Sequence, residues 1–123
     1  MNVVDSSGWL EYFADGPNAN FFASAIEDTD RLVVPVISIY EVFKRILQQR
    51  GEDEALQAVG VMTQAHVIDL DVTIALASAK LSHDQKLPMA DSIILATAQA
   101  NNATLWTQDA DLDGKHNVRY ISK

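Results

Sequence analysis

The sequence predicts a three-layer α/β/α domain with a central, mainly parallel sheet of about five strands. Two observations carry this prediction. Short apolar, often β-branched runs alternate with amphipathic segments of helical period along all 123 residues, and strands separated by helices imply right-handed crossovers. The runs are apolar at successive positions, as in strands buried on both faces. We find no linker, repeat or low-complexity tract, and we expect residues 1–123 to form one domain.

Five segments have the character of short buried strands. They are 3–4, 32–36, 66–70, 104–107 and 118–121. Six segments between or after them show helical period or helix-end signals. The first runs from Ser6 or Ser7 to about residue 13, and the other five are 21–26, 38–50, 52–62, 72–82 and 90–100. Ser6 or Ser7 is expected to cap the first helix, and Gly51 to end the third. The fourth helix places Leu56, Val59 and Met62 in its apolar pattern.

The composition limits the classes of function. Hydrophobic residues make up 48% of the chain, enough for a core, and the absence of cysteine excludes disulfides and thiolate metal sites. The net charge of -8, from 17 acidic and 9 basic residues, argues against indiscriminate nucleic-acid binding. No signal segment precedes Asp5, and no apolar run approaches the roughly 20 residues of a membrane span. We therefore expect a cytoplasmic protein without membrane contact.

Four acidic residues each follow a predicted strand or open a predicted helix: Asp5, Glu41, Asp91 and Asp109. Each has a structural interpretation, since Ser38 to Glu41 fits a capping box and the others suit a helix start or a turn. Together they favour another interpretation, because ligands of parallel α/β sheets bind at the carboxyl ends of the strands. Carboxylates gathered there repel one another, and Mg²⁺ or Mn²⁺ would offset that repulsion. The acids therefore predict a metal site.

Four motifs resemble one known family. They are Val4-Asp5-Ser6-Ser7, Ser38-Ile39-Tyr40-Glu41-Val42, the run 87–98 that starts Leu87-Pro88-Met89-Ala90-Asp91, and Leu105-Trp106-Thr107-Gln108-Asp109. In this order they resemble the PIN-domain ribonucleases, and among these the VapC-type toxins of toxin–antitoxin pairs. The resemblance covers essentially the whole chain, and the Leu-Pro-x-Ala-Asp helix start is its most specific part.

The resemblance implies a set of roles. Asp5, Glu41 and Asp91 would carry Mg²⁺ or Mn²⁺, with Asp109 as the fourth acid and Ser6 and Thr107 in support. Asp111 and Asp113 remain alternatives for the fourth acid, and either one or two ions would suit the site. The implied activity is endoribonuclease cleavage of transfer or ribosomal RNA, and the implied partners are a VapB-like antitoxin and a second copy of the chain.

Two alternatives accompany this interpretation. Lys44 and Arg45, which follow Glu41 on its helix, are candidates for RNA phosphate contacts, but Arg45 would equally suit an i,i+4 pair with Glu41 or a solvated position. The chain would also suit a catalytically silent module that keeps this fold for binding a protein partner. The presence of all four acids favours the enzyme.

Overall fold

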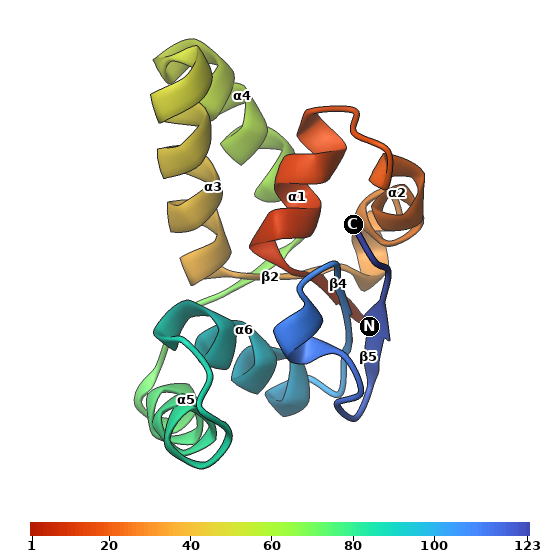
Figure 1. Ribbon diagram of the computed structural model, residues 1–123. Helices are drawn as coiled ribbons and strands as arrows, with labels where there is room; N and C mark the ends of the chain where they lie inside the picture. The colour runs from red at the N-terminus through yellow and green to blue at the C-terminus, as the bar shows by residue number, and fades with distance from the viewer.

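The computed structural model describes residues 1–123, in which pairs of helices separate the first four strands and a 3-10 turn precedes the fifth (Figure 1). The strands are β1 (Asn2–Val4), β2 (Val33–Pro35), β3 (His66–Ile68), β4 (Thr104–Thr107) and β5 (Val118–Tyr120). The helices are α1 (Ser6–Phe13), α2 (Ala19–Ile26), α3 (Val36–Arg50), α4 (Glu52–Met62), α5 (Val72–Gln85) and α6 (Met89–Ala100), with 3-10 turns η1 (Thr29–Arg31) and η2 (Ala110–Leu112). The predicted α/β class and the order of the elements are confirmed.

All strand pairs are parallel. Strand β4 lies between β1 and β5 in a three-stranded sheet, while β2 and β3 form a separate pair. One isolated parallel bridge, between Asn2 and Leu32, joins the pair to the larger sheet. The five expected strands are therefore present, although they do not form one continuous ladder. Because β1 and β4 are neighbours with Val4 opposite Trp106, the residues that follow these two strands leave the sheet side by side.

Helices cover both faces of the sheet, with α1 to α4 on one side and α5 and α6 on the other (Figure 1). Successive strand residues point to opposite faces, and the core divides accordingly. Val4 and Trp106 belong to the cluster under α1 to α4, whereas their neighbours Val3 and Leu105 belong to the cluster against α6. The sheet is thus buried on both sides, as the continuous apolar runs predicted.

The structure corrects three element boundaries. Helix α3 begins at Val36 and not near Ser38, because β2 already ends at Pro35, so Glu41 lies in the second helical turn. Strand β3 ends at Ile68 because the chain turns to enter α5, where the Asp71 side chain accepts the Ile74 N–H at 2.8 Å. Helix α5 continues to Gln85 through polar residues that carry no hydrophobic period.

Helix α6 is the most deeply covered element, with seven consecutive buried residues from Ser92 to Ala98. The helix is therefore covered on most sides, and this burial holds the start of α6 in a defined position. Helix α4 differs from its predicted pattern. Its buried residues are Ala55, Ala58 and Met62, whereas Leu56 is 53% exposed, because short side chains allow α4 to pack closely.

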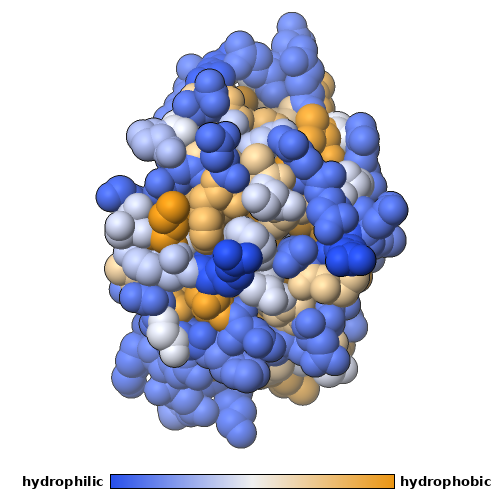
Figure 2. Space-filling model, turned by 90° about the vertical axis from the view of Figure 1, so that its right-hand side faces the viewer, coloured by the Kyte–Doolittle hydropathy of each residue, from blue (hydrophilic) through white to orange (hydrophobic).

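Exposed large apolar side chains are unevenly distributed. Apart from Met1, all of them lie between residues 36 and 89, on the elements from α3 to the start of α6. The face on the side of α2 and β5 is mostly hydrophilic, with apolar residues scattered over it (Figure 2). Among the helices, none combines the length and the apolar character that crossing a bilayer requires. The exposed apolar surface is thus confined mainly to the elements from α3 to the start of α6.

Candidate active site

Asp5 lies at the floor of a cleft, directly after β1. Its backbone N–H donates to the Trp106 carbonyl at 2.9 Å, which continues the β1–β4 pairing by one residue. Its own carbonyl accepts from Gly8 and Trp9, so the same residue also starts α1. Gly8 is required there, since a Cβ at that position would lie 2.6 Å from the Phe22 ring. The strand and the helix together leave the Asp5 side chain only 3% exposed.

Two hydroxyl groups hold the Asp5 carboxylate. Thr107 Oγ1 donates to Asp5 Oδ2 at 2.8 Å, and Ser7 Oγ donates to the same oxygen at 3.1 Å. Burial raises the pKa of Asp5, and the hydrogen bonds from Thr107 and Ser7 oppose that rise. These donors therefore favour the charged carboxylate, which is the form that would bind a cation.

Glu41 reaches the cleft from α3. Its Oε1 accepts a hydrogen bond from Ser6 Oγ at 2.7 Å, across 35 residues of sequence. The predicted capping box is wrong, because α3 starts before Ser38 and no side-chain bond caps it. Ser38 Oγ is instead buried without a partner.

The expected capping of α1 by Ser6 or Ser7 is also wrong, since Asp5 occupies the N-cap position and both hydroxyls bind acids of the cleft.

Asp91 lies in the first turn of α6, on the opposite side of the cleft from α1. Its pKa is raised to about 7 by burial, then by the negative charges of Asp5 and Asp109 and an interaction with the Asp109 side chain, with Glu41 contributing least. A shift of this origin requires the other acids to lie nearby. The carboxylates are thus close enough to repel one another.

Asp109 comes two residues after β4 and caps η2, where its Oδ1 accepts the Asp111 N–H at 2.9 Å. The buried Thr107 side chain accepts the Asp109 N–H at 2.9 Å, which ties this loop to the cleft floor. Leu112, fully buried in the core against α6, anchors the other end of η2. Asp111 and Asp113 are exposed and do not line the cleft.

The four acids thus line one cleft of about 300 Å³. Its lining residues are Asp5, Ser6, Ser7, Leu10, Glu41, Arg45, Asp91 and Asp109. The donors are carboxylate and hydroxyl oxygens without cysteine or histidine, a chemistry that suits Mg²⁺ or Mn²⁺ and not a softer metal. No three acidic or histidine side chains form a ready-made metal cage. The donor set therefore fits a hard divalent cation, and binding would require the carboxylates to draw closer.

Two basic residues of α3 lie at or beside the cleft. Arg45 lines it, and Lys44 places its Nζ 5.8 Å from the centre of the Tyr40 ring. The alternative i,i+4 pair between Arg45 and Glu41 is absent, and the one ion pair made by a lysine or arginine joins Arg50 to Glu54 at 3.4 Å. Arg45 is therefore free of a carboxylate partner at the rim of an acidic cleft.

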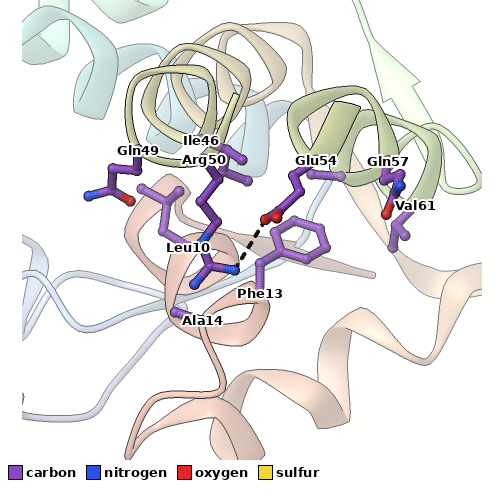
Figure 3. Close-up of a pocket in the computed structure, with 10 residues that line it drawn as sticks. Leu10, Phe13, Ala14, Ile46, Gln49, Arg50, Glu54, Gln57 and Val61 are labelled. Carbon is purple, nitrogen blue, oxygen red and sulfur yellow. Dashed lines mark hydrogen bonds and ion pairs between the residues drawn. The ribbon is translucent and has the colours of Figure 1, made fainter. Parts of the chain in front are cut away.

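A larger groove of about 470 Å³ lies next to the cleft, between α1, α3 and α4 (Figure 3). Leu10 lines both hollows, so the groove and the acidic cleft are neighbours. Leu10, Phe13 and Ile46 supply apolar surface, and the Arg50–Glu54 pair crosses the groove (Figure 3). An amphipathic segment of a partner would suit such a surface.

Sequence reasoning missed two supports of the cleft. Ser7 was expected only as a helix cap, although a hydroxyl two residues after an acid can bond back to it. Gln108, between Thr107 and Asp109, is 8% exposed. Nothing in the sequence around it predicted a role in supporting the cleft. Its Oε1 accepts from Asn18 Nδ2 at 3.0 Å, and its Nε2 donates weakly to the Ser7 carbonyl at 3.4 Å. Only folding brings these segments together.

Comparisons with known proteins show the family and the fold of the chain. The PIN domain family matches residues 3–116 of the chain. A toxin–antitoxin complex from Klebsiella pneumoniae contains a chain of similar fold, with 23% identity, coverage of 97% of this chain and 96% of that chain, and a TM-score of 0.81. VapC20 from Mycobacterium tuberculosis, described as a toxin that cleaves the sarcin-ricin loop, has 16% identity, coverage of 97% and 99%, and a TM-score of 0.77. DNA-bound VapBC from Salmonella typhimurium has 15% identity, coverage of 99% and 98%, and a TM-score of 0.72. No curated protein matches the chain in sequence.

Proposed function

Because the chain belongs to the PIN domain family, we propose that it is a toxin-type endoribonuclease that hydrolyses RNA phosphodiester bonds with Mg²⁺ or Mn²⁺. One observation carries the proposal: four carboxylates from separate parts of the chain, Asp5, Glu41, Asp91 and Asp109, line one small cleft. The raised pKa of Asp91 indicates that they repel one another. A protein keeps such a costly arrangement where a cation or a reaction uses it.

The side chains divide into ligands and supports. Asp5, Glu41 and Asp91 would hold the cation, with Asp109 as the fourth acid. When bound, the ion would lower the pKa of water and offset the charge that grows on the scissile phosphate. Thr107 holds Asp5 in its charged form, and Ser6 orients Glu41. A carboxylate of the cluster would orient the attacking water or accept its proton.

Substitution of single acids tests this function. Asp5→Asn and Asp91→Asn keep the size of the side chain but remove a charge, and we expect either change to abolish Mg²⁺-dependent cleavage of transfer or ribosomal RNA. Asp111→Asn is the matched control, because Asp111 is exposed and lies outside the cleft. Circular dichroism would verify that all three variants fold. Undiminished cleavage by the Asp5 or Asp91 variant would refute the proposal. Saturable Mn²⁺ binding without cleavage of any RNA would instead favour the silent binding module.

We propose a small VapB-like antitoxin as the protein partner, since two of the similar structures are toxin–antitoxin complexes. The groove of Leu10, Phe13 and Val61 supports this, because part of its lining is apolar and it shares Leu10 with the acidic cleft. A helix of the antitoxin seated there would place its next residues over the acids and block access of RNA.

We also propose that the chain forms a homodimer. Val72 and Leu76, one turn apart on α5, are 76% and 68% exposed, and Met89 at the start of α6 is 70% exposed. A hollow of about 490 Å³ with a mostly apolar lining lies between α5 and α6, next to Met89. Burial against a second copy would remove this apolar surface from water.

A further inference from the structure

An aromatic side chain and a cation lie together on α3, one position away from the residues that line the acidic cleft. Tyr40 is 60% exposed, and Lys44 Nζ lies 5.8 Å from the centre of its ring. Residues four apart share one face of a helix, so Tyr40 and Lys44 form one stripe. Glu41 and Arg45 form the next stripe, about 100° further around the helix, and this second stripe faces the cleft.

Helix α3 has a charge opposite to that of the whole chain. It carries Lys44, Arg45 and Arg50 against the single acid Glu41, in a protein with a net charge of -8. Arg50 is neutralised by Glu54 on α4. Lys44 and Arg45 make no ion pair; Arg45 lines the cleft, and Lys44 precedes it on the same helix. A polyanion that approaches the four carboxylates would meet favourable charge along this part of α3.

We propose that Tyr40 and Lys44 form a platform on which an unpaired base of the RNA substrate stacks, beside the phosphate that is cleaved. This inference rests on the proposed ribonuclease function and adds to it one contact between a base and named residues of α3. A duplex keeps its bases stacked inside and offers the Tyr40 ring nothing to contact. Lys44 would add a contact to the phosphate backbone of the same nucleotide.

Stacking suits this location for an electrostatic reason. Four carboxylates in the cleft repel the phosphates that the enzyme has to bind, so charge attraction alone gives weak binding there. Contact between a base and an aromatic ring involves no net charge and is tolerant of sequence. An exposed tyrosine next to Glu41 on α3 would therefore supply binding free energy that the acids do not cancel.

A protein partner is the competing occupant of this surface. Val36 and Leu47 are also exposed on α3, at 37% and 41%. Lys44 favours RNA, because its ammonium group lies over the ring and a purely apolar interface would have to desolvate it. The two occupants predict different effects of the same substitution.

The test measures RNA binding and cleavage separately. Fluorescence anisotropy would follow binding of a labelled hairpin RNA with an unpaired loop, and of a fully paired duplex, to the Asp91→Asn protein with Mg²⁺ present. We expect Tyr40→Leu in this background to weaken hairpin binding by about 5- to 100-fold, while Tyr40→Phe retains it and duplex binding stays the same. Gln48→Ala, at another exposed position of α3, is the control. In the otherwise unchanged protein, Tyr40→Leu should raise KM for the hairpin and leave kcat unaltered.

Three results would overturn the platform. In the first, Tyr40→Leu leaves hairpin binding intact. In the second, Tyr40→Leu and Tyr40→Phe weaken hairpin binding equally. In the third, Tyr40→Leu weakens binding of the hairpin and of the duplex equally. A Tyr40→Leu variant that binds RNA normally but loses self-association or antitoxin binding would assign the surface to a protein interface. Failure of the ribonuclease proposal looks different, because it appears in cleavage and not in binding: cleavage either persists in Asp91→Asn or is absent from the unchanged protein, whatever effect a substitution at Tyr40 has on RNA binding.

Discussion

Replacement of Thr107 by valine removes one hydroxyl group from the floor of the acidic cleft and keeps the shape of the side chain. The hydroxyl makes two hydrogen bonds in a fully buried position. It donates to Asp5 Oδ2 at 2.8 Å and accepts the Asp109 N–H at 2.9 Å. Thr107→Val therefore loosens two of the four acids without adding or removing a charge.

The structure supports a magnitude for this change. A hydrogen bond to a charged group contributes about 1.5–3 kcal/mol, which corresponds to roughly 10- to 100-fold in affinity. Loss of a group that orients a metal ligand typically weakens metal binding by a similar factor, about 10–100-fold. Valine also raises the pKa of Asp5 further, since it removes a donor that opposes the effect of burial. We expect the dissociation constant of Mn²⁺ to rise by about 10- to 100-fold.

The matched control is Thr97→Val, the same substitution at another fully covered position. Thr97 Oγ1 donates at 2.7 Å to the Ile93 carbonyl, within α6 and away from the acids. Isothermal titration with Mn²⁺ at about pH 8, above the raised pKa of Asp91, would compare the two variants with the unchanged protein. Urea unfolding in EDTA would verify that both variants fold. Mn²⁺ binding by Thr107→Val that equals that of Thr97→Val would refute the reasoning.

Three further predictions concern pH, the partner and the dimer. The pKa of Asp91 is raised from 3.8 to about 7, so the stability that this group contributes is complete below pH 3.8 and is lost as the pH rises towards 7. In EDTA, Asp91→Asn should therefore unfold at a higher temperature than the unchanged protein, by a margin that grows over this range and then stays constant; a margin independent of pH would contradict the shift. Val61→Asp places a charge in the groove between α1, α3 and α4 and should abolish antitoxin binding in a co-purification while RNA cleavage persists, whereas retained binding would place the antitoxin elsewhere. Leu76→Glu should convert a dimer to a monomer in sedimentation velocity, and an unchanged sedimentation coefficient would exclude this face of α5 as the interface.

The local pattern of the sequence determined the element types and their order. Val33 and Val34 read as a buried strand and proved to be one, because a parallel sheet covered on both faces needs apolar residues at successive positions. The run from Ser92 to Ala98 likewise indicated a helix without a solvent face. Local pattern was weaker at boundaries. It placed the start of α3 near Ser38, where the residues fit a capping box that would mark the start of a helix, although β2 ends at Pro35 and the helix begins directly after it.

The acids illustrate the same division. The acids follow strands or lie near helix starts, and the motifs around Asp5 and Asp91 are distinctive. These features predicted that the acids gather at one site, and in the structure Asp5, Glu41, Asp91 and Asp109 line one cleft. The resemblance implied that Ser6 and Thr107 support the site, but their bonding partners could not be predicted, because each bond joins residues that are distant in sequence. Ser6 binds Glu41 across 35 positions, Thr107 binds Asp5 across 102, and Gln108 meets Asn18 across 90.

Periodicity and motif order, which are properties of neighbouring residues, were enough to identify an α/β chain with an acidic centre. Tertiary structure alone decided which hydroxyls donate to Asp5 and Glu41, that Arg45 stays unpaired, and that a partly apolar groove adjoins the cleft at Leu10. The physical reason is that burial and charge repulsion depend on distances in space. The pKa of Asp91 is raised by burial and by acids that come from three other parts of the chain.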